Sequence, residues 1–311
     1  MSGRLALLCP GQGGQHAAMF DFARQHATAR AALSRWDLPA ACGHAGASLD
    51  DVLRDPQALF DNRSAQALVV ASTLATWIAL KDALPTPAAV VGYSVGELSA
   101  WAVAGGLDAD EAISLARRRA ALMSDCADGG PVQALAAVSG LPGELLDGVL
   151  AQTGFSLAIE TPASVIVGGL QRQLPALREV VERQAGKLTV LPVNVASHTP
   201  LMQPAQAPFH AMLGSLLRDA GIPVIAGVDA ERLTSADAGA NALSRQLAEP
   251  IRFKDCLDAV AESGVTAAFE LGPASALSRM LRQAHPHIAC RSVCDFRTVD
   301  GAIQWMGRAL E

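Results

Sequence analysis

The pentapeptide Gly-Tyr-Ser-Val-Gly centred on Ser94 constrains this chain more than any other stretch of its sequence. It follows a short β-branched run, Ala89–Val91, and is followed by a helix-forming segment that starts at Glu97. A strand, a sharp turn and a helix around G-x-S-x-G are typical of a nucleophile elbow. The turn is so tight that side chains at Gly92 and Gly96 would collide, so both positions require glycine. The pattern predicts a nucleophilic serine, and the alternative is a glycine-rich turn with a serine helix cap.

The same turn supplies a group that could stabilise negative charge. The backbone N–H of Val95 comes directly after the serine and lies at the start of the following helix, where the helix dipole favours an oxyanion. We therefore expect the turn to provide both a nucleophile and half of an oxyanion hole.

Composition limits the kind of protein this can be. The chain has 311 residues, of which 50% are hydrophobic and 17% are charged, so it can bury a large core. Its 24 basic and 30 acidic residues give a net charge of -6, which argues against a general nucleic-acid binder. No feature indicates a large hydrophobic interface, so we expect a monomer.

The cysteines indicate neither a disulfide framework nor a metal site. The six cysteines are scattered without a C-x-x-C pair, so no metal site is expected. We find no signal peptide and no apolar run of the roughly 18 residues that a membrane span needs, so no membrane partner is expected. Free thiols and no export signal predict a cytoplasmic protein.

The order of predicted elements gives the fold class. Strands alternate with helices in residues 1–128 and 192–311, which predicts one large α/β domain, α/β-hydrolase-like, with a mostly parallel sheet. Between them, residues 129–191 read as β-α-β-β-α-β, the order of a ferredoxin-like domain. We expect this small domain to be an insertion into the large one.

A serine nucleophile needs a base, and seven histidines are available. Six of them fall in polar loops or inside a helical run. His198 follows the segment 193–197, which we predict to be a strand, and parallel α/β sheets collect ligands at their strand ends. Its position alone does not decide between a catalytic base and a buried structural histidine at residue 198.

Three successive arginines, 117–119, fall in the middle of a predicted helix. Successive helical residues are spread around the helix, so the three cannot share one face. At least one of them is therefore predicted to point inward or toward a cleft.

Five ordered segments carry a resemblance that covers nearly the whole chain. The sequence resembles the malonyl-CoA:acyl carrier protein transacylases in Gly-Gln-Gly-Gly-Gln at 11–15, the elbow at 92–97, Arg119 with Leu-Met at 122–123, Ser-His at 197–198 with Leu-Met at 201–202, and Gln246 before Glu-Pro at 249–250.

The resemblance implies a catalytic role for five residues. Ser94 would become malonylated and His198 would activate it. The backbone N–H groups of Gln12 and Val95 would form the oxyanion hole. A backbone carbonyl near Gln246 would orient the histidine in place of the usual aspartate.

The resemblance also implies how substrate is held. Arg119 would bind the malonyl carboxylate through a bidentate pair, for which a guanidinium is suited, and Gln12 and Gln246 would also line the site. Two positions depart from the family pattern. Tyr93 stands where the family usually has histidine, which changes the acyl pocket. Ser197 stands where malonyl-selective members often have phenylalanine, and its smaller side chain could admit a substituted malonyl group.

The implied function is transfer of a malonyl group from malonyl-CoA to the phosphopantetheine thiol of an acyl carrier protein, through a malonyl-serine and with no cofactor bound to this chain. The setting is fatty-acid or polyketide synthesis, or the transacylase subunit of a malonate decarboxylase. The alternative is a serine esterase or thioesterase of the α/β-hydrolase type, which would place an acidic residue after the serine and would not need Arg119. A degenerate scaffold domain is a third reading.

Overall fold

Side chains that alternate along the first strand explain how the larger sheet is covered on both faces. The computed structural model describes residues 3–311. In β1 (Leu5–Cys9), Leu5 and Leu7 belong to one hydrophobic cluster, whereas Ala6 and Leu8 belong to a second. Successive strand residues point to opposite faces. A strand that is apolar throughout therefore requires helices on both sides.

The larger sheet has six strands and is parallel except at one edge. Its order is β11-β10-β1-β2-β7-β8, and only β7 and β8 pair antiparallel. Leu7 of β1 pairs with Val90 of β2 on one side and with Phe269 of β10 on the other. The bounds are β2 (Ala89–Gly92), β7 (Val224–Ile225), β8 (Arg232–Leu233), β10 (Ala267–Glu270) and β11 (Ala289–Ser292).

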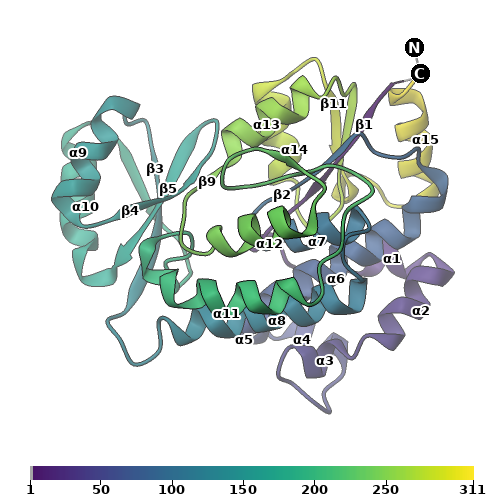
Figure 1. Ribbon diagram of the computed structural model, residues 1–311, viewed down its shortest axis with the longest axis horizontal. Coiled ribbons are helices and arrows are strands. Elements are labelled where there is room, and N and C mark those ends of the chain that lie inside the picture. Colours follow the sequence, from purple (N-terminus) through teal and green to yellow (C-terminus); the bar gives the residue numbers. More distant parts are fainter. Residues whose placement is uncertain (1–2) are drawn as a thin grey trace.

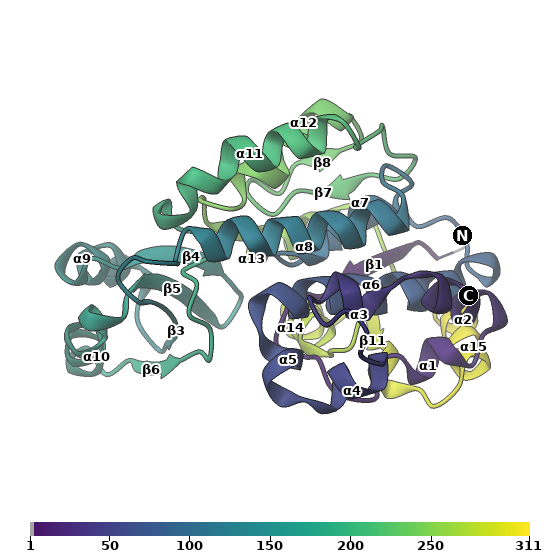
Figure 2. The same cartoon turned by 90° about the horizontal axis from the view of Figure 1, so that it is seen from below.

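Helices cover the two faces of this sheet unequally (Figure 1). One face packs against α6 (Asn62–Leu80), α7 (Gly96–Val103) and α15 (Val299–Ala309), and the other against α13 (Phe253–Glu262) and α14 (Ala276–Ala284). Figure 2 shows α8 (Ala109–Asp125), α11 (Gln203–Gly214) and α12 (Ala236–Arg245) running side by side outside the first layer. The remaining short helices before α6 are α1 (Asp21–Arg24), α2 (Ala27–Arg35), α3 (Leu38–Ala41), α4 (Leu49–Arg54) and α5 (Pro56–Phe60).

Helix α6 is the central core helix. By length and hydropathy alone, Asn62–Ala83 is long and apolar enough to cross a membrane, contrary to the expectation that no apolar run reaches that length. Within the fold, 83% of the 18-residue apolar stretch in this segment is buried. Burial on all sides explains why the helix is apolar nearly all round.

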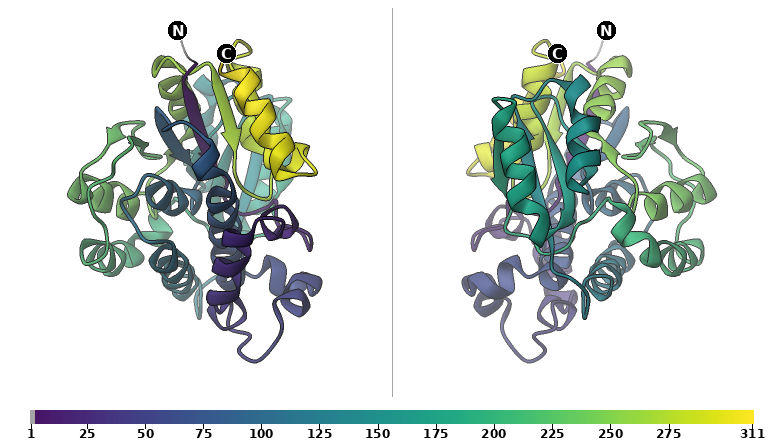
Figure 3. Two further views of the ribbon diagram at one scale, coloured as in Figure 1. Left: turned by 90° about the vertical axis from the view of Figure 1, so that its right-hand side faces the viewer. Right: turned by 90° about the vertical axis from the view of Figure 1, so that its left-hand side faces the viewer.

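The second sheet lies at the other end of the molecule. The predicted order β-α-β-β-α-β is present, as β3 (Gln133–Ser139), α9 (Gly143–Thr153), β4 (Ser156–Glu160), β5 (Ser164–Leu170), α10 (Leu174–Arg183) and β6 (Lys187–Val190). The strand order is β6-β3-β5-β4, all antiparallel. Figure 3 shows α9 and α10 on the outer face of this sheet.

One strand of the second sheet was not predicted. β9 (Ile251–Arg252) lies well after residues 129–191 in the chain and pairs parallel with β4, Ile159 opposite Ile251. Two residues are too few for a period-2 pattern, so this strand could not be predicted from the sequence. β9 joins the second sheet to the larger part of the chain.

The segment before His198 differs from the prediction. Residues 191–197 form no strand, because their backbone groups bond elsewhere: Val193 N–H donates to Leu191 O, and Ala196 N–H donates to the Gln133 side chain at 2.8 Å. The apolar pattern Val193–Val195 that suggested a strand reflects burial of an irregular loop. His198 therefore does not sit at a strand end.

Candidate active site

The turn around Ser94 is as tight as the sequence requires. Ser94 has φ of 54°, a left-handed conformation that is unusual for a residue with a side chain. A Cβ on Gly92 would lie 2.2 Å from the backbone N of Glu97, and one on Gly96 would lie 2.1 Å from the carbonyl O of Cys9. The two glycines let the strand and helix close on each other. The hydroxyl of Ser94 is thereby presented at the apex of the bend.

His198 lies beside this hydroxyl. Its Nε2 is 2.8 Å from Ser94 Oγ, and its Nδ1 is 2.5 Å from the carbonyl O of Gln246. A carbonyl oxygen only accepts, so Nδ1 carries the proton and Nε2 is free to accept from the serine. The backbone N–H of His198 donates to Leu247 O at 2.8 Å, which fixes the loop although His198 itself has φ of 62°.

The imidazole of His198 is held neutral. Burial, together with the positive charge of Arg119, lowers its pKa from 6.5 to about 3. A buried neutral imidazole with a free Nε2 is suited to take a proton from a serine hydroxyl during attack. Gln246, just after α12, occupies the place where a hydrolase triad would have a carboxylate.

Arg119 on α8 completes the group. It is only 1% exposed, and its Nη2 lies 3.5 Å from Ser94 Oγ. Its other hydrogen bonds go to the side-chain oxygens of Gln66 (2.7 Å) and Gln246 (3.1 Å). Arg117 and Arg118 are exposed, so the prediction that one arginine of the three points inward is confirmed.

Arg119 is a buried charge with only neutral hydrogen-bond partners. Burial lowers its pKa from 12.5 to about 10, and the charge of Glu97 opposes that change. A buried guanidinium without a carboxylate partner is costly. The geometry leaves it available to an anionic group that binds next to Ser94.

The amide side chains that support Arg119 were not predicted. Gln66, fully buried in α6, accepts from Arg119 and donates to Asn62 Oδ1 at 2.9 Å. Asn62 in turn donates to Ala120 O and Ser124 Oγ, each at 3.1 Å. The only available signal was a glutamine inside an otherwise apolar helix, where buried polar groups need partners.

Glu97 was also missed. We interpreted it as a helix-forming residue, but its side chain is fully buried and its Oε2 accepts from Gln246 Nε2 (2.6 Å) and Gly227 N–H (2.9 Å). An acidic residue in the first turn of a helix ordinarily faces solvent and complements the helix dipole. Because an exposed acidic residue at a helix start has the same sequence pattern, the buried position of Glu97 could not be predicted from the sequence.

The glycine-rich loop packs directly on the elbow. A Cβ on Gly11 would lie 2.6 Å from Tyr93 O and 3.5 Å from Ser94 Cβ. Gln12 is half-buried, and its Nε2 is 3.4 Å from Asn62 Oδ1. Within residues 3–311, the backbone N–H groups of Gln12 and Val95 donate no hydrogen bond. Both are therefore free for a ligand.

A cavity of about 590 Å³ opens between this loop and α14, and Gln12 and Tyr93 line it. The Tyr93 ring packs edge-on against Phe253, with centroids 4.9 Å apart, and burial raises the pKa of its hydroxyl. Of the predicted residues, Ser197 is not brought into the group: it is half-buried, and within the described chain its side chain makes no hydrogen bond.

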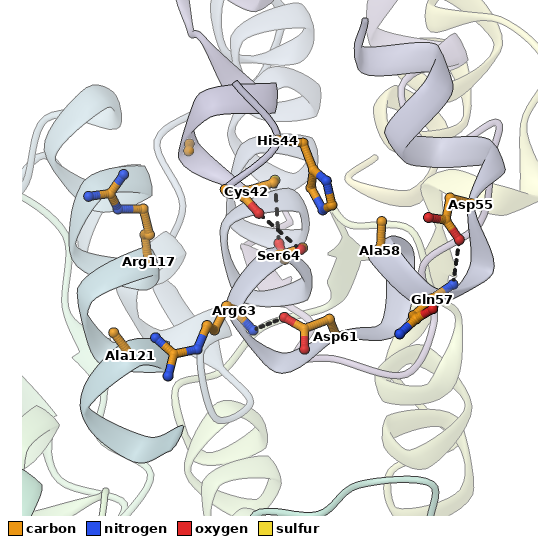
Figure 4. A pocket seen from close by; sticks show the side chains of 12 residues that line it. Cys42, His44, Asp55, Gln57, Ala58, Asp61, Arg63, Ser64, Arg117 and Ala121 are labelled. Atoms are coloured by element: carbon orange, nitrogen blue, oxygen red, sulfur yellow. Dashed lines mark hydrogen bonds between the residues drawn. The ribbon is translucent and has the colours of Figure 1, made fainter. Parts of the chain in front are cut away.

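Figure 4 shows a larger hollow, of about 610 Å³, and Ser94 is not among the residues that line it. Arg117 lines it, and since Arg117 is two residues from Arg119 it lies about 200° round the helix from the site. The Arg63 backbone N–H donates to Asp61, and the Arg63 side chain pairs with Asp125 and Asp128, so the charge of Arg63 at this hollow is already paired.

Comparison with known proteins decides the family. Residues 6–297 match the family described as acyl transferase domain. The chain belongs to the acyl transferase family. The malonyl CoA-acyl carrier protein transacylase of Mycobacterium bovis is 31% identical to this acyl transferase over 304 residues, which cover 93% of the chain and 96% of the relative. The Bacillus subtilis protein of the same name is 28% identical over 258 residues, covering 80% and 81%.

A solved structure agrees in shape. The malonyl-CoA:acyl carrier protein transacylase of Xanthomonas oryzae pv. oryzae superposes on this acyl transferase with a TM-score of 0.88 at 27% identity, covering 98% of the chain and 99% of that structure. The prediction of an acyltransferase of this family is confirmed, and so is the mixed α/β fold. The esterase alternative is not favoured.

Proposed function

We propose that this acyl transferase moves a malonyl group from malonyl-CoA to the phosphopantetheine thiol of an acyl carrier protein. The observation that carries the proposal is the buried guanidinium of Arg119, which has only neutral partners and lies 3.5 Å from Ser94 Oγ. An acyl group with a terminal carboxylate would supply the directly hydrogen-bonded anion that Arg119 lacks. An uncharged acyl group would leave the guanidinium unpaired.

The chemistry is a two-step exchange on Ser94. His198 Nε2 takes the hydroxyl proton as Ser94 attacks the thioester carbonyl, and gives it to the departing CoA sulfur. The carrier thiol then enters, loses its proton to His198 and attacks the ester carbonyl. The bond to Ser94 Oγ breaks, and His198 returns the proton to that oxygen. The free N–H groups of Gln12 and Val95 are proposed to stabilise the oxyanion in both steps. Tyr93 is proposed to contact the acyl group and Ser197 to leave room beside it.

The domain division is part of the proposal. We assign residues 1–128 and 192–311 to a large α/β-hydrolase-like domain and residues 129–191 to a ferredoxin-like one. A hydrophobic cluster formed only from the second part, including Val138, Phe155 and Leu177, supports this division. We further propose that the protein acts as a monomer in the cytoplasm.

Intact-mass measurement after mixing with malonyl-CoA tests the function. The protein is expected to gain the mass of one malonyl group, and Ser94→Ala is expected to gain none. Holo-carrier protein should then remove the adduct and become malonylated. Carriers of fatty-acid synthesis, polyketide synthesis and malonate decarboxylase, tested side by side, identify the pathway. Release of free malonate without any carrier would instead indicate the hydrolase alternative.

A further inference from the structure

Glu97 is a buried acid for which the proposed mechanism has no use. It lies three residues after Ser94, in the first turn of α7, and is 0% exposed. Both of its hydrogen bonds reach the same oxygen, Oε2, and Oε1 has no partner within residues 3–311. A buried carboxylate with one oxygen unpartnered is destabilising. Such a group calls for a functional explanation.

Gln246 connects this carboxylate to the reacting groups. Its side-chain Oε1 accepts from Arg119, its Nε2 donates to Glu97, and its backbone carbonyl accepts from His198. The orientation of its amide is determined, because an arginine can only donate and must face the oxygen. The side chain of Gln246 therefore contacts both Glu97 and Arg119, and its backbone carbonyl contacts His198.

The charged and titratable groups near Glu97 come from three neighbouring elements. Arg119 of α8 stabilises the carboxylate, whereas Asp229 of the loop after β7 disfavours it. The thiol of Cys256, on α13, also faces it, and burial keeps that thiol protonated by raising its pKa. Asp229 is itself paired with Arg245 at 3.0 Å. Arg119 is therefore the cation whose charge reaches Glu97, although the two share no hydrogen bond and are connected only through Gln246.

We propose that Glu97 is a positioning residue for carboxylated acyl groups: through Gln246 it holds Arg119 in place, and its carboxylate competes with that of the bound acyl group for the charge of Arg119. The inference rests on the proposed function, because it takes the acyl group to be malonyl. It adds a means by which the protein senses whether the acyl group carries a carboxylate.

Because the carboxylates of Glu97 and of the malonyl group compete for Arg119, binding of the acyl group is coupled to protonation of Glu97. Burial raises the pKa of Glu97 from 4.5 to about 7; the hydrogen bonds from Gly227 and Gln246 oppose that rise most, and the charge of Arg119 adds to their effect. When a malonyl carboxylate takes up the charge of Arg119, the pKa of Glu97 rises further, so the protein binds a proton together with the acyl group. Malonyl binding is therefore strongest below pH 7 and weakens as the pH rises above it.

The test compares two acyl donors over pH 6 to 8.5. We would measure kcat/KM for acylation of Ser94 by malonyl-CoA and by acetyl-CoA, using quenched samples and intact mass. Dividing kcat/KM for malonyl-CoA by kcat/KM for acetyl-CoA cancels any effect of pH on the CoA portion of the substrate and on His198. In the wild type the ratio should fall about tenfold over this range, the effect of a coupling of about one pKa unit. In Glu97→Gln, whose carbonyl can still accept from Gly227 and Gln246, the ratio should be independent of pH.

Asp229→Asn is the matched control, because it removes a nearby acid without touching Gln246. Asp229 raises the pKa of Glu97, so this variant should keep the fall and move its midpoint to lower pH. An equal fall in Glu97→Gln and wild type would overturn the inference. Absence of any malonyl adduct in the wild type would instead overturn the proposed function.

A second measurement needs no variant. In weakly buffered solution at pH 7 with an indicator dye, acylation by malonyl-CoA should take up a fraction of a proton per enzyme. Acylation by acetyl-CoA, which forms the same ester and the same protonated thiol, should take up none. Equal proton uptake with both donors would overturn the inference even if Glu97→Gln does not fold.

Discussion

Ser94 Oγ lies 2.8 Å from Nε2 of His198, although 104 residues separate them in the sequence. Both residues have positive φ, 54° and 62°. Such backbone conformations are costly for residues with side chains and persist where the surrounding structure holds them. Here a glycine-walled turn holds the serine, and hydrogen bonds to Gln246 and Leu247 hold the histidine.

Replacing the base should remove most of the acylation rate. His198→Ala is expected to slow acylation of Ser94 by about 10²–10⁴-fold, since a positioned base contributes that much. His210→Gln, an exposed histidine on α11, should leave the rate unchanged. Quenched-flow acylation measures both. A loss of less than tenfold in His198→Ala would show that another group takes the proton.

The pH profile follows from the neutral state of His198. Its pKa is lowered to about 3, so the imidazole stays unprotonated and competent from about pH 5 upward. Acylation by acetyl-CoA should therefore be flat between pH 5 and 8, where an ordinary histidine would lose activity below pH 6.5. A fall with a midpoint near 6.5 would contradict the buried, neutral imidazole.

The elbow was predictable because its chemistry is local. Gly92 and Gly96 are required by a turn of five residues, and those residues are contiguous. One buried arginine among three followed equally from helix geometry. His198 was chosen for a strand end that does not exist, so the choice of residue rested on the family resemblance.

Glu97, Gln66 and Asn62 were not predictable, because their roles depend on partners far away in the chain. Gln246 is 149 residues from the carboxylate of Glu97, and Gln66 is 53 residues from Arg119. A single sequence contains no signal for such pairs. Strand β9 has too few residues for an alternating pattern, and its partner β4 lies far away in the sequence.

A methyl group at Gly92 should disrupt the elbow. Its Cβ would meet the backbone N and Cα of Glu97 at 2.2 and 2.3 Å, and backbone atoms cannot move aside cheaply. Gly92→Ala is expected to abolish acylation and destabilise the fold by more than about 2 kcal/mol. Gly148→Ala is the control, as an exposed glycine in α9 with open space around it. It should stabilise by about 0.5–1 kcal/mol in urea unfolding.

Removing the guanidinium should affect malonyl and acetyl groups differently. Arg119→Ala is expected to weaken malonyl binding by about 2–5 kcal/mol, because a buried carboxylate loses its partner, while acetyl transfer stays equal or improves. Arg119→Lys should retain only part of the malonyl binding, since an ammonium cannot form the bidentate pair. The exposed Arg117→Ala is the control. Equal losses for both acyl donors would contradict the pairing.

The stability of the fold should also report the buried acid. Because the folded pKa of Glu97 is raised from 4.5 to about 7, its protonated form stabilises the protein below pH 4.5, and that contribution is lost as the pH rises through 7. Between pH 5 and 8 the loss is about 2–3 kcal/mol in the free energy of unfolding. Glu97→Gln has no proton to lose, so its stability relative to wild type should increase by that amount over the same range. Urea unfolding at the two pH values measures the difference, with the exposed Glu231→Gln as control. A pH-independent difference between Glu97→Gln and wild type would mean that the carboxylate is ionised in the folded protein at both pH values.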